Sequence, residues 1–121
     1  MHDVVHIGVI VKDVEKSKDF YCNILGCEFQ SAYGTEKFKI VLVKAGNQVI
    51  ELLEDKTPSD DKRGAGVIDH IAFNVDDIEK ALANLQSAGV TILDMPRAAS
   101  GNKKVMFFEG PDGERLEFVE G

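Results

Sequence analysis

The chain has 121 residues, of which 44% are hydrophobic and 29% charged, the composition of one globular domain or of two half-domains that share a core. Its net charge of -7 argues against nucleic acid, because phosphate binding requires a basic surface. No apolar run approaches the roughly 20 residues that cross a bilayer, and the first residues do not resemble a signal peptide. We therefore expect a cytoplasmic protein that binds neither nucleic acid nor membrane.

An internal repeat organises the sequence. Residues 6–16 and 70–80 share the pattern His-Ile-x-x-x-Val-x-Asp-[Val/Ile]-Glu-Lys, and their histidines are 64 positions apart. Each repeat also ends alike, with Glu51 lying 45 residues after His6 and Glu117 lying 47 residues after His70. Matches at both ends of a unit indicate a duplicated structural unit rather than a chance similarity.

Each repeat is predicted to open with a strand and a helix. Alternating apolar residues predict strands at 4–11 and 68–75. Asp13 and Asp77 stand where a side-chain oxygen can cap the helix that follows. In the second half the helix shows helical apolar spacing and can end at Gly89, as the first can at Gly26.

Three short strands are predicted to complete each unit. They lie at 27–33, 37–44, 48–54, 91–93, 104–109 and 115–120, with turns at 45–48 and 110–113. The predicted fold class is α+β, with two tandem βαβββ units that form a curved mixed sheet with a metal-binding cleft. The first unit is expected at 1–56, a linker at 57–66 and the second unit at 67–121.

Four polar residues recur at equivalent positions of the two units. Because strand side chains alternate between faces, His6, Glu51, His70 and Glu117 should all project from the face that no helix covers. A carboxylate among large apolar residues is costly to bury without a partner. Two imidazoles and two carboxylates suit a first-row divalent cation, although any one of the four alone would read as an ordinary core or surface residue.

Other histidine and cysteine residues carry less information. His2 has no counterpart in the repeat and is predicted to be a solvated tail residue. Cys22 and Cys27 have neither a redox nor a zinc-ribbon spacing, so we interpret them as structural thiols in or near the first helix.

These residues resemble the vicinal oxygen chelate superfamily, which groups glyoxalases, bleomycin-resistance proteins and extradiol dioxygenases. The resemblance covers essentially the whole chain. Besides the four candidate ligands, it rests on residues 6–13, 19–21, 25–26, 49–52, 69–75 and 110–117. Within the superfamily the ligand pattern is most similar to bacterial lactoylglutathione lyase (glyoxalase I).

The resemblance implies a metal-dependent lyase or isomerase of the glyoxalase I type, acting by alpha-proton transfer through a metal-bound enediolate. Metal ligands would be His6, Glu51, His70 and Glu117, with Glu117 as the catalytic base and Glu51 as its counterpart. The implied cofactor is one divalent ion per site, nickel, cobalt or zinc. A small-molecule substrate, such as a glutathione adduct or an acyl-CoA, and a homodimer are also implied.

Two positions depart from the glyoxalase I pattern and leave other functions open. The family's glutathione-binding arginine is Ile10 here, and its companion asparagine is Asp55. A methylmalonyl-CoA epimerase-like enzyme is one alternative, favoured by residues 94–105 and disfavoured by the glyoxalase-type turn at 110–113. A non-catalytic protein that sequesters an antibiotic is another, although such proteins usually lack the metal ligands. Ring-cleaving dioxygenases and fosfomycin-type transferases use three ligands, so the fourth ligand, Glu51, argues against them.

Overall fold

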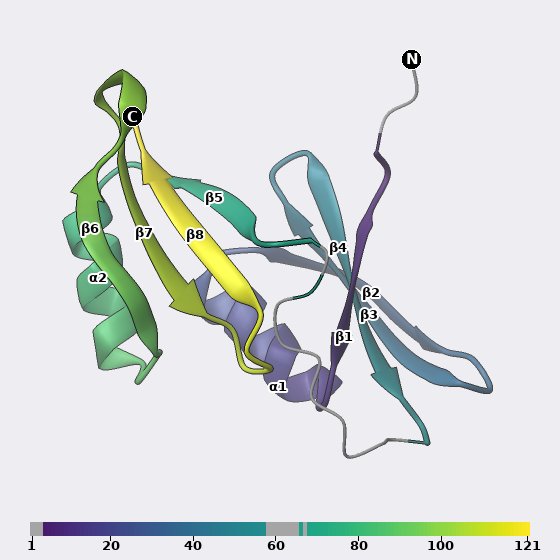
Figure 1. Cartoon of the computed structure of the whole chain (residues 1–121). Helices are drawn as coiled ribbons and strands as arrows, with labels where there is room; N and C mark the ends of the chain where they lie inside the picture. Colours follow the sequence, from purple (N-terminus) through teal and green to yellow (C-terminus); the bar gives the residue numbers. More distant parts are fainter. Residues whose placement is uncertain (1–3, 58–65, 67) are drawn as a thin grey trace. The chain divides into compact units, whose positions relative to one another are not determined.

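The computed structural model describes residues 4–57, 66 and 68–121, so that most of the predicted linker at 57–66, and His2, lie outside the described residues. The chain divides into two compact units, residues 1–61 and 62–121, which are each described by themselves. Each unit contains one mixed sheet of four strands and one principal helix (Figure 1).

The first unit follows the predicted βαβββ order. Its elements are β1 (Ile7–Val11), α1 (Val14–Asp19), a π-helical turn (Phe20–Ile24), β2 (Glu28–Gly34), β3 (Phe38–Ala45) and β4 (Gln48–Asp55). In the sheet the strands lie in the order β1-β4-β3-β2. β1 runs parallel to β4, whereas the other neighbours are antiparallel.

The second unit repeats this topology. Its elements are β5 (Ile71–Val75), α2 (Ile78–Ser87), β6 (Ile92–Ala98), a 3₁₀ turn (Ser100–Asn102), β7 (Lys104–Glu109) and β8 (Arg115–Glu120). The strand order is β5-β8-β7-β6, with β5 parallel to β8. The predicted α+β class with two tandem βαβββ units is therefore confirmed, and the strands form two sheets of four.

Apolar residues at alternate strand positions form the core between each helix and its sheet. Ile50 and Leu52 of β4 are fully buried, as are Leu116 of β8 and Phe108 of β7. α1 contacts β3 and β4, while α2 contacts β6, β7 and β8. No helix among the described residues has the length and apolar character that a bilayer crossing requires.

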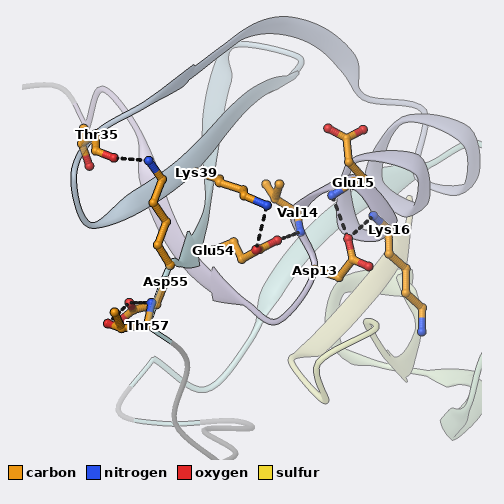
Figure 2. Close-up of polar contacts among 10 residues, drawn as sticks. Asp13, Val14, Glu15, Lys16, Thr35, Lys39, Glu54, Asp55 and Thr57 are labelled. Atoms are coloured by element: carbon orange, nitrogen blue, oxygen red, sulfur yellow. Dashed lines mark hydrogen bonds and ion pairs between the residues drawn. The ribbon is translucent and has the colours of Figure 1, made fainter.

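A glutamate from the last strand of each unit caps the helix of the same unit. Glu54 accepts a hydrogen bond from the Val14 amide at 2.9 Å, and Glu120 accepts one from the Ile78 amide at 2.8 Å. In the first unit Lys39 pairs with Glu54 at 3.5 Å, and Asp13 accepts from the next two amides of α1 (Figure 2). Each helix N-terminus, where free amides carry partial positive charge, is thus held by two carboxylates.

The strand bounds correct the sequence prediction in three places. β1 and β5 begin at Ile7 and Ile71, so the strands predicted from 4 and 68 start three residues later. β6 extends to Ala98, beyond the predicted end at 93, because an edge strand tolerates Pro96 and two register irregularities.

The first helix also differs from the prediction, since its second half widens into the π-helical turn. There the Leu25 amide donates to the Phe20 carbonyl, five residues earlier.

Candidate metal centre

In the first unit, His6 and Glu51 lie close together. His6 immediately precedes β1, and Glu51 lies in β4, the strand paired with β1. His6 Nε2 is 4.0 Å from Glu51 Oε2, and the two side chains are 46% and 17% exposed. The parallel register places Gly8 directly beside Glu51.

In the second unit, His70 and Glu117 form the equivalent pair at shorter distance. His70 immediately precedes β5, and Glu117 lies in β8 beside Ala72. His70 Nε2 is 3.2 Å from Glu117 Oε1, with side-chain exposures of 35% and 13%. Both histidines therefore lie one residue outside the strands in which they were predicted, at matching positions.

The helix-capping glutamates establish which face of the sheet carries the paired carboxylates. Glu54 and Glu120 contact the helices, and each lies three positions after Glu51 or Glu117 in the same strand. Because residues an odd number of positions apart point to opposite faces of a strand, Glu51 and Glu117 project away from the helix of their unit.

Both paired carboxylates are mostly buried and have few protein partners. Among the described residues, neither Glu51 nor Glu117 has a hydrogen bond or ion pair beyond the one with its histidine. A buried carboxylate normally accepts several hydrogen bonds or faces a cation, since removing its charge from water is costly. A cation bound at either pair would therefore compensate the negative charge of the carboxylate.

His70 has additional partners that His6 lacks within the described residues. Its Nδ1 lies 2.8 Å from Oδ2 of Asp69, and its ring meets the Phe107 ring edge-on at a centroid distance of 5.3 Å. Arg115 lies over Phe107 and 3.3 Å from both oxygens of Asp69. The hydrogen bond with His70 lowers the pKa of Asp69 below its ordinary value, and Arg115 lowers it further.

The Asp69 contact was not foreseen from the sequence, which placed this side chain on the helix face. Alternation sets side-chain direction only inside a strand, and Asp69 lies two residues before β5. The string Asp-His ahead of an apolar strand is the signal that the prediction did not use.

The donor atoms of the second pair fit a first-row divalent ion. An ionised Asp69 can only accept, so Nδ1 of His70 donates to it, and Nε2 would be the ring atom available to a cation held between the ring and Glu117. Two ligand atoms that each lie about 2.1 Å from one ion are about 3.0–3.4 Å apart when the angle between them is roughly 90–110°. The observed 3.2 Å falls within this range, whereas the 4.0 Å of the first pair is somewhat longer.

The structure thus places the four predicted ligands as two His/Glu pairs, one in each unit. Within either unit, the described side chains include no group of three or more His, Cys, Asp or Glu that could hold a metal ion. Convergence of the two pairs on one ion remains a prediction.

The two positions that depart from glyoxalase I also have defined surroundings. Ile10 lies in β1, on the same side as Gly8, and is 37% exposed. Asp55 ends β4 and accepts hydrogen bonds at 2.9 Å from both the amide and the hydroxyl of Thr57. These bonds lower the pKa of Asp55, so the carboxylate is negatively charged at neutral pH.

Two tandem βαβββ units, each with one His/Glu pair, define an α+β protein of duplicated architecture. A family model described as the glyoxalase/bleomycin resistance protein/dioxygenase superfamily matches residues 3–118. The chain belongs to this superfamily. A crystal structure of a glyoxalase family protein from Enterococcus faecalis has a TM-score of 0.79 and 26% identity, covering 98% of this chain and 97% of that one.

Curated relatives carry different names. The uncharacterized protein YaeR of Escherichia coli (strain K12) is 37% identical, covering 99% of this chain and 97% of its own length. A probable lactoylglutathione lyase of Synechocystis is 30% identical over 97% of this chain and 94% of its own. A mitochondrial methylmalonyl-CoA epimerase of Dictyostelium discoideum is 31% identical over 84% and 67%.

Proposed function

We propose that the chain is a metal-dependent isomerase or lyase of the glyoxalase I type, which moves a proton at a carbon next to a carbonyl group. The observation that carries this proposal is the duplicated His/Glu pair, with each carboxylate mostly buried beside its histidine. His6, Glu51, His70 and Glu117 would hold one divalent cation, nickel, cobalt or zinc. Relatives named as lactoylglutathione lyase and as methylmalonyl-CoA epimerase support chemistry of this kind.

Glu117 is the proposed catalytic base. It is the less exposed of the two carboxylates, and a carboxylate within reach of the substrate can supply general base catalysis. It would accept the alpha proton of the substrate and return it to the neighbouring carbon. In an epimerase-like reaction its counterpart, Glu51, would instead donate a proton to the opposite face. When bound, the cation would stabilise negative charge on substrate oxygens by several kcal/mol.

The two residues that depart from the glyoxalase I pattern do not suit a glutamyl carboxylate. Ile10 offers no positive charge, and Asp55 would repel an anion because its own carboxylate is ionised. These observations favour a methylmalonyl-CoA epimerase-like activity as the second candidate, because its proton transfer does not require a glutathione-binding arginine. The binding of an antibiotic without catalysis is a third outcome to be tested.

Metal content and proton exchange test the proposal. Purified protein reconstituted with Ni²⁺, Co²⁺ or Zn²⁺ should bind one ion per pair of repeats and convert either methylglyoxal–glutathione hemithioacetal or methylmalonyl-CoA. Glu117→Gln should lower kcat by about 10²–10⁴-fold, as expected for loss of a general base. Glu79→Gln, an exposed change on α2, is the matched control and should have no effect.

Three results would count against the proposal. Protein that binds no divalent ion would refute the metal centre, and full turnover by Glu117→Gln would refute its role as base. Tight binding of an antibiotic by protein that turns over neither substrate would instead identify a sequestering protein.

A further inference from the structure

We propose that Asp69, held by Arg115, is a positioning residue that fixes the ring of His70 so that Nε2 faces the metal cation. This inference rests on the proposed metal centre. It assigns the orientation of His70 to residues of the second unit that are not themselves proposed metal ligands. It concerns Asp69, Arg115 and Phe107, none of which is a predicted ligand.

The ring of His70 is held at three points. Asp69 Oδ2 accepts from Nδ1 at 2.8 Å, Glu117 Oε1 lies 3.2 Å from Nε2, and Phe107 packs against the ring edge-on. The bond with Asp69 occupies Nδ1, so that Nε2 is the ring atom that would bind a cation. A carboxylate on the far nitrogen also raises the basicity of a histidine ligand.

Arg115 gives the exposed carboxylate a fixed orientation. The Asp69 side chain is 63% exposed, so without a partner it would rotate freely in water. One guanidinium nitrogen of Arg115 lies 3.3 Å from both of its oxygens, and the guanidinium also lies over Phe107 at 5.6 Å from the ring centroid. Phe107 therefore contacts both Arg115 and His70, so the four side chains support one another.

This support is confined to the second unit. In the repeat, the residue before His6 is Val5, and the residue two positions before Glu51 is Val49. Neither valine can accept a hydrogen bond from an imidazole or pair with a carboxylate. The arrangement is thus not a necessary consequence of the fold, which both units share.

The test compares Asp69→Ala and Asp69→Asn with the parent protein, using Zn²⁺ alone as the probe. Zn²⁺ affinity is measured by competition with a chromophoric chelator, and the hydrogen bond at Nδ1 of His70 by ¹⁵N NMR of the metal-free protein. Loss of an outer partner of a histidine ligand typically weakens metal binding about 10–100-fold, and we expect this loss in both variants. The hydrogen-bonded Nδ1–H signal of His70 should be lost in Asp69→Ala, and the urea unfolding midpoint should change little because Asp69 is exposed.

Asp76→Ala is the matched control, because Asp76 is an exposed aspartate of the same unit. Unchanged Zn²⁺ affinity in Asp69→Ala, or an equal loss in the control, would overturn the proposal. If the parent protein bound no Zn²⁺, the proposed function would fail separately. The NMR signal would then decide, because an unchanged Nδ1–H signal in Asp69→Ala refutes the positioning role.

Discussion

The two units share strand order, helix capping and a His/Glu pair, yet they surround their histidines differently. His70 contacts Asp69 and Phe107 as well as Glu117, and it is closer to its glutamate than His6 is. His6 has only Glu51 as a described partner, at 4.0 Å, and is more exposed. Duplication of a fold therefore reproduced the positions of the paired histidine and glutamate without reproducing the side chains around them.

Replacing each histidine should give the largest difference between the units. His70→Ala and His6→Ala should both weaken Zn²⁺ binding by more than the 10–100-fold typical of an outer partner, because each removes a ligand. The loss should be greater for His70→Ala, since a ring that is already oriented loses less freedom on binding. Chelator competition measures both affinities, and His2→Ala serves as the control. Equal losses for His6 and His70 would show that the additional contacts of His70 do not matter for affinity.

Thiol labelling examines the first unit alone, because both cysteines lie there. Burial raises the pKa of Cys27 to about 11, against an ordinary value of 9.0. The thiolate reacts and the thiol does not, so at pH 8 the reactive fraction of Cys27 is about 100-fold below that of an ordinary thiol. Iodoacetamide should therefore modify Cys27 more slowly than the half-buried Cys22, with the rate rising until the pH approaches 11.

Peptide mass spectrometry separates the two labelled sites. Equal labelling rates for Cys22 and Cys27 would mean that the core of the first unit opens readily. The few contacts of His6 would then reflect a low stability of the whole unit. Slow labelling of Cys27 would mean that the first unit has a stable core and differs from the second only in the residues around its histidine, His6.

The helix-capping glutamates should give the smallest effect and a similar one in both units. Glu54→Ala and Glu120→Ala each remove the acceptor of a helix amide, which typically costs about 1 kcal/mol. Urea unfolding measures the cost, and Glu28→Ala, at an exposed position of β2, should stay within about 0.5 kcal/mol of the parent. A much larger cost for one variant would show that the two units differ in their helix contacts also.

The order of elements could be predicted from the sequence because the repeat and the apolar periodicity determine it twice over. The pairing of His6 with Glu51 and of His70 with Glu117 follows from that topology, since the first and last strands of each unit are neighbours. The length of β6 could not be predicted, because Pro96 and two register irregularities interrupt the alternation of apolar and polar residues that identifies a strand. The Asp69 contact was missed for a related reason, as it lies outside the strand.

Glu51 and Glu54, like Glu117 and Glu120, are three positions apart and point to opposite faces of one strand. A single-residue insertion or deletion between the members of either couple would put both carboxylates on the same face. Either the cation would lose its ligand or the helix would lose its cap. Evolution can therefore exchange the side chains at these sites by substitution, but it cannot change the number of residues between them by one without losing one of the two roles.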